Sequence, residues 1–396
     1  MNNEKSEKMN IINDYNEIKD EIIAIRRKIH QNPELSNDEF ETAKTICECL
    51  DKYNISYKFP VAKTGICAFI GNADKGKTVL IRADMDALPV KEESGVDFSS
   101  KNDGVMHACG HDVHVANALA AAIILKKHEA ELKGCVKIIF QPAEETDGGA
   151  EPMINEGILN NPDVDVAIGI HVTPLYPTGD MYFKEGPLMA APDDFTLTFV
   201  GKSSHGAEPE NGINPMNPAS EFVLGIHKEL AKEIDFSKNV FSVCTFNCGT
   251  SFNQIADTAT LSGTFRSYDD KDRKACDRIC REYAEKLCEK YNTKIKFAYS
   301  YRYPPLINDA TVCKDVKAFA EKIFGKDKIK EFEKPLMTGE DFSYIAREVP
   351  SVFIWAGCGD ENHPCVLHSA NFYADENVIE KAVRLFVGYT FDYLNR

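Results

Sequence analysis

The stretch KTVLIRAD (77–84) is an apolar run, rich in β-branched residues, that ends in a carboxylate. It predicts a fully buried strand, because its apolar residues follow one another without the polar alternation of a half-exposed strand. VKIIFQ (136–141) and DVAIGIH (165–171) have the same character, and DVHVANALAAAIILKKHE (112–129) predicts a helix between the first two strands. Strands that alternate with helices predict an α/β fold, with a mixed, mostly parallel sheet and helices on both faces.

Side chains able to bind metal follow each of these strands. Ligands of open α/β sheets gather beyond the carboxyl ends of the strands, so residues that come directly after different strands are expected at one edge. The metal-capable residues in these positions, together with those at the start of the 112–129 helix, are Asp84, Asp86, Cys109, His111, Glu144, Glu145 and His171. The sequence therefore predicts a metal site at this edge of the sheet.

From about residue 193 the chain changes to alternating apolar and polar residues. The order strand, helix, two strands, helix, strand over 193–303 fits a ferredoxin-like α+β sandwich with an antiparallel sheet. The buried α/β pattern then resumes, with SVFIWAG (351–357) as a strand and a last helix near 375–394. We therefore expect a larger domain made of 1–192 and 304–396, with a smaller domain inserted at 193–303.

The composition is that of a globular protein. Hydrophobic residues make up 43% of the 396 positions, and the formal net charge is −16. The acidic balance disfavours binding to nucleic acid, whose phosphates attract Lys and Arg. The longest apolar run, 118–125, is too short to span a bilayer. The polar N-terminus MNNEKSEKMN (1–10) lacks the apolar core of a signal peptide, so we expect a cytoplasmic protein.

Thirteen cysteines are scattered along the chain, and we expect nearly all of them to be reduced packing residues. Cys109 is the exception, because it lies in MHACGHDVH (106–114), which holds three of the ten histidines. In an extended segment Cys109 and His111 project to the same side, with Gly110 allowing a tight turn. Thiolate and imidazole are ligands of zinc and related transition metals. A Cys-x-His pair alone would be a weak signal, so the expectation rests on the other donors as well.

The acidic doublet in QPAEETDGG (141–149) adds a second kind of chemistry. One carboxylate can bind metal, while its neighbour, pointing elsewhere, can take a proton from a water as general base. A bound divalent metal lowers the pKa of such a water from 15.7 to roughly 7, so hydroxide becomes available at neutral pH. The alternative is a solvated surface turn, which the preceding buried strand and the flanking glycines disfavour.

The chain resembles the M20 metallopeptidase family, and within it the amidohydrolase branch of hippurate hydrolases, N-acyl-amino-acid amidohydrolases and auxin-conjugate hydrolases. The resemblance rests on separate motifs that run from near the start of the chain to near its end, in the family's order. These motifs are RRKIHQNPELSNDEFETA (26–43), RADMDALPV (82–90), MHACGHD (106–112), IFQPAEE (139–145), GIHVTP (169–174), GKSSHGAEP (201–209), FNQIADTATLSGTFR (252–266), MTGEDFSY (337–344) and VLHSANF (366–372).

This resemblance implies two divalent ions, of zinc, manganese, cobalt or nickel, with one ligand shared between them. The implied metal ligands are Cys109, His111, Glu145, His171 and His368. Glu144 is the implied general base, and Cys109 stands where other branches carry a bridging aspartate. Asp86 resembles the family's carboxylate that orients the ligands. Asp84 stands where other branches carry a ligand histidine, so its role stays open.

The resemblance also gives roles to the inserted domain, which serves the family as a lid and as a dimerisation surface. His205 is implied to reach the scissile carbonyl, often from the partner subunit, and to stabilise the oxyanion. Asn253 and Arg266 match substrate-side groups, and a guanidinium can grip a carboxylate in bidentate fashion. The alternatives are a loop histidine on a polar surface and an exposed strand arginine. We expect a homodimer through this domain.

The motifs together predict a metal-dependent amidohydrolase that cleaves the bond between an acyl group and the nitrogen of an amino acid. A dipeptidase that uses the same metals is the alternative within the family. Two others are an enzyme with Cys109 as nucleophile and a non-catalytic carrier, against which the intact Glu144 argues. Val113, Glu210 and Asn214 depart from residues common in the branch, which leaves substrate choice more open than hydrolysis.

Overall fold

The computed structural model describes residues 10–396, which divide into two compact units. Unit 1 comprises the described residues up to Gly186, Ile307–Glu333 and Tyr344–Arg396, and unit 2 comprises Pro187–Leu306 and Lys334–Ser343. Lys334–Ser343 lies beyond the predicted insertion but belongs to unit 2, where Tyr268 donates hydrogen bonds to its backbone carbonyls. The segment on which the signal-peptide expectation depends, 1–9, lies outside the described residues.

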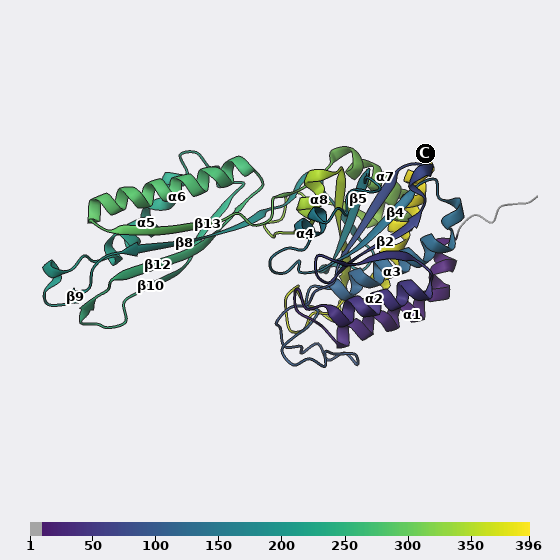
Figure 1. Ribbon diagram of the computed structural model, residues 1–396, viewed down its shortest axis with the longest axis horizontal. Coiled ribbons are helices and arrows are strands. Elements are labelled where there is room, and N and C mark those ends of the chain that lie inside the picture. The colour runs from purple at the N-terminus through teal and green to yellow at the C-terminus, as the bar shows by residue number, and fades with distance from the viewer. Residues whose placement is uncertain (1–9) are drawn as a thin grey trace, which may run out of the picture. The chain divides into compact units, whose positions relative to one another are not determined.

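Unit 1 is built on an eight-stranded sheet in the order β1-β2-β4-β3-β5-β16-β6-β15 (Figure 1). The strands are β1 (Ser56–Val61), β2 (Gly65–Gly71), β3 (Thr78–Asp84), β4 (Cys135–Gln141), β5 (Val166–Pro177), β6 (Met181–Phe183), β15 (Ile329–Glu331) and β16 (Ser351–Gly359). The central strands β4, β3, β5 and β16 run parallel, and antiparallel pairs join β1 to β2, β2 to β4 and β6 to β16. The predicted mostly parallel α/β sheet is therefore confirmed.

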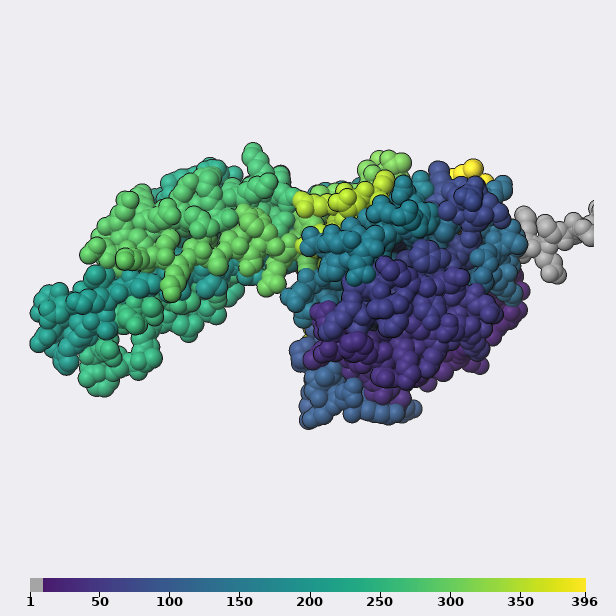
Figure 2. Space-filling view, in the orientation of Figure 1, coloured from purple at the N-terminus to yellow at the C-terminus, as the bar shows by residue number. Residues whose placement is uncertain are grey.

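Helices pack on this sheet because their apolar stripes have no other place to be buried. They are α1 (Ile11–Gln31), α2 (Phe40–Lys52), α3 (His111–Lys127), α4 (Ala150–Asn155), α7 (Ala310–Phe324), α8 (Phe342–Glu348) and α9 (Asn377–Leu394). Helix α3 is buried on all sides between α1, α9 and β3, which explains its nearly unbroken apolar sequence. The first helices and the β1–β2 hairpin, drawn purple, form much of the visible face of unit 1 (Figure 2).

The opposite face of the sheet is also covered. Lys137 of β4 is buried there, and its ammonium donates to the carbonyls of Ile158 and Asn160 at 2.9 and 2.7 Å. The segment after α4 therefore closes this face, and the central strands are buried on both sides as a parallel sheet requires. No helix within 10–396 is both long and apolar enough to cross a membrane.

Unit 2 has the topology of a ferredoxin-like sandwich. Its antiparallel sheet has the order β10-β12-β8-β13, and two helices lie along one face of it (Figure 1). The elements are β8 (Ala191–Val200), α5 (Met216–Leu230), β10 (Val240–Cys248), β12 (Thr258–Ser267), α6 (Asp270–Tyr291) and β13 (Lys294–Ser300), with β9 (Ser204–His205) paired to β11 (Gln254–Ile255). Alternate residues of β8, Phe195, Leu197 and Phe199, point into the core. The short strands β7 (Gly186–Met189) and β14 (Leu306–Asn308) complete the elements.

Candidate metal centre

The Cys109-Gly110-His111 segment is a turn into a helix. Gly110 has φ 86° and ψ 17°, and His111 is the first residue of α3. The predicted extended backbone is therefore wrong, although the ligand atoms of Cys109 and His111 do lie within 4.8 Å of each other. The left-handed Gly110 at the helix start brings the two side chains together instead. Only glycine suits this position, because a Cβ here would lie 2.5 Å from Cγ2 of Val172 and the positive φ disfavours other residues.

All five predicted metal ligands lie together in unit 1. Sγ of Cys109 is 3.4 Å from Nε2 of His171 and 3.3 Å from Nε2 of His368. Oε1 of Glu145 is 3.3 Å from the same His368 nitrogen and 3.8 Å from Nε2 of His111. The donor atoms form two groups, each within 4.8 Å, which are Cys109 with His111 and His171, and Cys109 with Glu145 and His368. Cys109 is common to both groups.

Hydrogen bonds leave the Nε2 lone pairs of two histidines available. His111 donates from Nδ1 to the backbone carbonyl and the carboxylate of Asp86, at 2.9 and 3.1 Å, and His171 donates from Nδ1 to the carbonyl of Val172 at 2.7 Å. The lone pair of each neutral ring therefore lies on Nε2. Within 10–396, Nε2 of His111 and Oε1 of Glu145 are buried without a hydrogen-bond partner. Buried acceptors of this kind fit a bound cation.

The electrostatics of the cluster also suit a cation. Burial lowers the pKa of His111, but the charge of Asp84, the hydrogen bond to Asp86 and the charge of Glu145 outweigh it and raise this pKa to about 10. Burial, and then carboxylates led by Glu145, raise the pKa of the Cys109 thiol well above its ordinary value. Negative groups are thus in excess here. A second proton on His111 balances part of this charge, and a divalent ion at Nε2 would take the place of that proton.

Glu144 lies in the loop that follows β4, and its side chain is buried. Its carboxylate belongs to a third group of ligand atoms, with those of His111 and Glu145, all within 4.8 Å. The amide of Gly148 donates to the carbonyl of Ala143 at 3.0 Å, which closes the loop around the doublet. Glu144 and Glu145 therefore lie side by side at the edge of the sheet, and the carboxylates of both are close to His111.

Asp86 is hydrogen-bonded to two of the predicted metal ligands, His111 and Glu145. Its Oδ1 accepts from His111, and its Oδ2 accepts from the backbone amide of Glu145 at 3.0 Å and from the hydroxyl of Ser36 at 2.7 Å. Burial raises the pKa of this carboxyl, but these donors outweigh burial and lower it. Asp86 thus fixes the ring of His111 and the backbone of Glu145.

Asp84 and His114 form a pair that the sequence left open. Asp84 accepts from Nη1 of Arg82 at 2.6 Å and from Nδ1 of His114 at 2.5 Å, and Nε2 of His114 accepts the amide of Val172 at 2.9 Å. The ligand atoms of Asp84 and His114 lie within 4.8 Å of one another and of that of His111. The hydrogen bonds to Arg82 and Val172, and the one between Asp84 and His114, already engage them. The pair therefore anchors β5 next to His171. The available signal was spacing, since His114 follows His111 by one helical turn.

The predicted residues of unit 2 are not brought together. His205 is exposed in β9, and Asn253 is exposed beside it, with the amide of Gly206 donating to its carbonyl at 2.7 Å. Arg266 is half-buried and pairs with Val240 at the start of β10, whereas Asn253 follows the end of that nine-residue strand. Strand rise puts the two ends roughly 25 Å apart. Arg266 and the His205–Asn253 pair thus occupy opposite ends of the unit 2 sheet.

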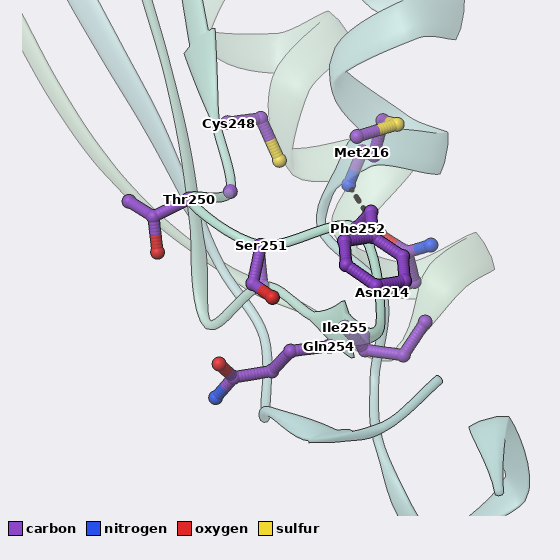
Figure 3. Close-up of a pocket in the computed structure, with 10 residues that line it drawn as sticks. Asn214, Met216, Cys248, Thr250, Ser251, Phe252, Gln254 and Ile255 are labelled. Carbon is purple, nitrogen blue, oxygen red and sulfur yellow. Dashed lines mark hydrogen bonds between the residues drawn. The ribbon is translucent and has the colours of Figure 1, made fainter. Parts of the chain in front are cut away.

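A hollow of about 420 Å³ lies in unit 2 at the end that carries Asn253 (Figure 3). It is lined by Asn214, Met216, Cys248, Gly249, Thr250, Ser251, Phe252, Gln254, Ile255 and Ala256. The amide of Met216 donates to the side chain of Asn214 at 3.0 Å across one wall, and Phe252 is fully exposed. The lining has no charged side chain, so the hollow suits neutral or apolar groups rather than a metal or a carboxylate.

Residues 80–391 match the model of peptidase family M20/M25/M40, so the chain belongs to this family, as the motifs predicted. It is a metal-dependent hydrolase of linear amide bonds. Thermostable carboxypeptidase 2 of Saccharolobus solfataricus is 39% identical over 376 residues, which cover 93% of this chain and 94% of the relative. N-acetyl-L-cysteine deacetylase of Bacillus subtilis is 36% identical over 364 residues, covering 91% and 85%. The crystal structure of Bacillus subtilis YXEP protein, described as a dinuclear metal binding peptidase, has a TM-score of 0.82 and 33% identity, covering 96% and 99%.

Proposed function

We propose that this chain hydrolyses N-acyl-amino acids, releasing a carboxylic acid and a free amino acid. The carrying observation is the convergence in unit 1 of Cys109, His111 and His171, whose donor atoms lie within 4.8 Å of one another. Glu144, which belongs to the adjoining group of His111 and Glu145, adds a base that a metal carrier would not need. The N-acetyl-L-cysteine deacetylase relative supports the choice of substrate class.

The ligand set would hold two divalent ions. We assign the ligands as Cys109, His111, Glu145, His171 and His368. Cys109 would be shared, because it belongs to both groups of donor atoms. A thiolate, imidazoles and a carboxylate together suit zinc, manganese, cobalt or nickel better than magnesium or calcium.

Bound divalent metal supplies Lewis acidity that makes a water acidic enough to lose a proton near neutral pH. Glu144 takes that proton as general base and then delivers it to the leaving nitrogen, so that the amine departs uncharged. Asp86 keeps the proton of the His111 ring on Nδ1, which leaves Nε2 free as a ligand. Water attack thus breaks the carbon–nitrogen bond and leaves the acyl group as a carboxylic acid, which loses its remaining proton to solvent.

Arg266 would bind the carboxylate of the amino-acid part of the substrate. Its guanidinium is half-buried, and burial lowers its pKa. Its hydrogen bonds go to the hydroxyl of Thr264 and to backbone carbonyls, and no carboxylate among residues 10–396 pairs with it. A desolvated guanidinium without an acidic partner supports a role in binding an anionic group.

We further propose a homodimer through unit 2, in which His205 and Asn253 serve the site of the partner chain. The separation of these residues from Arg266 along the unit 2 sheet supports this arrangement, since one substrate cannot span both ends. His205 would donate to the oxyanion that forms at the scissile carbonyl. Strand β10 is at the edge of its sheet and exposes Val240 and Phe246, which gives a second copy a surface to pair with.

Metal analysis of the purified protein, combined with amine release from N-acetyl-L-cysteine, other acetyl-amino acids and benzoyl-glycine, tests the function. Glu144→Gln is expected to keep the metal and to lose about 10²–10⁴ in kcat. A chelator is expected to abolish turnover, and zinc, manganese or cobalt to restore it. Full turnover by Glu144→Gln, or activity that survives complete removal of metal, would rule out the proposed mechanism.

Complementation tests the shared site. Cys109→Ala and His205→Ala are each expected to be inactive alone. After unfolding and refolding as a mixture, half of the dimers combine the two variants, and each of these has one intact site, so about a quarter of wild-type activity returns. Failure of the mixture to regain activity, although each variant refolds as a dimer, would mean that His205 acts within its own chain.

A peptidase is the second candidate, and the carboxypeptidase relative from Saccharolobus favours it. A carboxypeptidase cleaves the same kind of bond, between an acyl carbon and the nitrogen of an amino acid with a free carboxylate. A kcat/KM for dipeptides or longer peptides that exceeds the values for acetyl-amino acids and benzoyl-glycine would identify the peptidase.

We also propose that the protein is cytoplasmic, because its thirteen cysteines are free thiols.

A further inference from the structure

We propose that Glu39, which has no role in the site described so far, positions the general base by holding the backbone of the residue before it. The inference rests on the proposed function, since it presumes that Glu144 is that base. Glu39 is fully buried at the start of α2, more than a hundred positions before Glu144 along the chain. Its carboxylate reaches the loop that carries the acidic doublet.

Ala143 is the residue through which Glu39 acts. It has φ 56°, the left-handed conformation that residues with a Cβ rarely adopt. Its amide donates to Oε1 of Glu39 at 3.0 Å, and its carbonyl accepts the amide of Gly148 at 3.0 Å. Such a conformation persists only where the surroundings fix it. Hydrogen bonds thus hold both the amide and the carbonyl of Ala143, and this fixes the direction in which the backbone continues to Glu144.

The carboxylate of Glu39 accepts three hydrogen bonds. Oε1 accepts the amide of Asn37 at 2.8 Å as well as that of Ala143, and Oε2 accepts the hydroxyl of Thr64 at 2.6 Å. All three partners are donors, so the side chain is a pure acceptor in this place. Burying a carboxylate is costly, and these three hydrogen bonds offset part of that cost. The remaining cost favours a structural role for Glu39, such as holding the loop at Ala143.

A second carboxylate holds the other side of Glu144. Asp86 accepts the backbone amide of Glu145 at 3.0 Å, so the amides immediately before and after Glu144 each donate to a buried acid. Ser36, which donates to Asp86, and Glu39 come from the same short segment before α2. Asp86 thus holds the peptide unit that follows Glu144. Glu39 holds the peptide unit before Ala143, and the unit between Ala143 and Glu144 is held through the Ala143 carbonyl by Gly148. A displacement of about 1 Å at such a group can cost roughly 10²-fold in rate.

Two near-isosteric substitutions separate geometry from charge. Glu39→Gln removes the charge but keeps the length, so its carbonyl oxygen can still accept from Ala143 while its amide donates to the hydroxyl of Thr64. Glu39→Asp keeps the charge but is one methylene shorter and loses reach to Ala143. If Glu39 positions the loop, Gln substitutes for it and Asp does not. If its charge matters, the order reverses.

The experiment measures kcat and KM for N-acetyl-L-cysteine and benzoyl-glycine with the metal-loaded protein, together with metal content and thermal unfolding. Glu39→Gln is expected within about threefold of wild type, and Glu39→Asp to lose about 10–100-fold in kcat, with KM and metal content unchanged. Thr64→Val, which removes only the contact to Oε2, is the control for disturbed packing and is expected to resemble Glu39→Gln. Adding Ala143→Gly to Glu39→Asp is expected to restore part of kcat, because glycine adopts positive φ without help.

The proposal is overturned if Glu39→Asp matches wild type, if Gln and Asp lose kcat equally, or if lost metal accounts for the loss. If Glu39→Asp does not fold, Glu39→Gln and Thr64→Val decide, and a large kcat loss in either contradicts the proposal. Glu144→Gln, assayed alongside, separates the two hypotheses. An inactive Glu144→Gln with unaffected Glu39 variants removes only the role of Glu39, whereas an active Glu144→Gln removes the assigned base and this inference with it.

Discussion

Unit 1 and unit 2 organise their polar residues in opposite ways. In unit 1, donors as far apart in sequence as Cys109 and His368 have their ligand atoms 3.3 Å apart. In unit 2, Asn253 and Arg266 are close in sequence but lie at opposite ends of a strand. The difference follows from the sheets, because parallel strands gather their carboxyl ends at one edge, whereas antiparallel strands send alternate ends to opposite edges.

This contrast supports the different tasks proposed for the two units. A metal cluster needs several donors within a few ångströms, which the parallel edge of unit 1 supplies from one chain. Substrate recognition needs contacts at separated points, and unit 2 offers a half-buried guanidinium at one end and an exposed histidine at the other. Changes to the proposed metal ligands of unit 1 should therefore alter metal content, and changes in unit 2 should alter turnover or KM with the metal retained.

The largest effect is expected from His171→Ala. The imidazole is buried and its Nε2 lies 3.4 Å from Sγ of Cys109. Its removal deletes one of the proposed metal ligands, so kcat should fall by about 10³-fold or more together with metal content. Metal analysis and initial rates check this. His363→Ala is the control and should behave as wild type, because His363 is exposed and its ring contacts nearby Asp360 and Tyr373. Normal metal content in His171→Ala would break the contrast between the units.

His205→Ala comes next. Loss of the proposed oxyanion donor should lower kcat by about 10²–10³-fold. Because His205 is exposed, stability and metal content should not change. Stopped assays and metal analysis of the same preparation check both parts, with exposed Lys202→Ala as the control. Metal loss in His205→Ala would show that unit 2 contributes to the cluster.

Arg266→Lys should have a smaller effect. A lysine keeps the charge but not the planar fork, so KM should rise by roughly tenfold for substrates with a free carboxylate, with kcat little changed. The rise should vanish for the corresponding amides, which lack the carboxylate. Arg278→Lys, a change at the exposed pair with Glu233, serves as the control. Equal KM values for acids and amides in the wild type would contradict the assignment.

The smallest effect on activity is expected from His30→Gln, which probes the frame of unit 1. His30 is buried between Asp112 and Glu92, at 2.8 and 3.1 Å. Burial lowers its pKa, but Asp112 and Glu92 outweigh burial and raise it above the ordinary value. Its stabilising contribution is therefore complete below about pH 6.5, the pKa of an unfolded-chain histidine, and is lost as the pH rises through the folded-state pKa.

Urea unfolding of wild type and His30→Gln at several pH values measures this difference. The destabilisation by His30→Gln should be largest below pH 6 and should shrink at alkaline pH, while kcat at neutral pH stays unchanged. A destabilisation that is the same at every pH would mean that packing, and not the charge of His30, stabilises this part of unit 1.

Several elements were predictable from the sequence because local patterns decide them. Unbroken apolar runs identified the central strands, and the polar alternation of β8 identified the change to an antiparallel sheet. The metal-capable residues were predictable because each follows a strand or begins a helix. Their roles as ligands stay predictions until metal is measured.

Other features depend on contacts between distant segments and left no local signal. The Cys109–His111 turn was expected to be extended, but Val172 from β5 allows only a glycine in a left-handed conformation there. Glu39 was visible in LSNDEFETA without a role, because nothing in that segment indicates that Ala143 lies next to it. Spacing put His114 one helical turn after His111, but its hydrogen bond to Asp84 was hidden, since that depends on where β3 meets α3.

The sequence alone determined the family, the order of strands and helices, and which residues carry metal-binding atoms, because apolar periodicity and motif chemistry are properties of short segments. Only the tertiary structure decided which lone pairs stay free, which carboxylates hold the loop around Glu144, and that Arg266 and His205 lie far apart in one sheet. The physical reason is that hydrogen bonds are settled by direction and distance between segments, and these are fixed only when the strands pair and the helices pack.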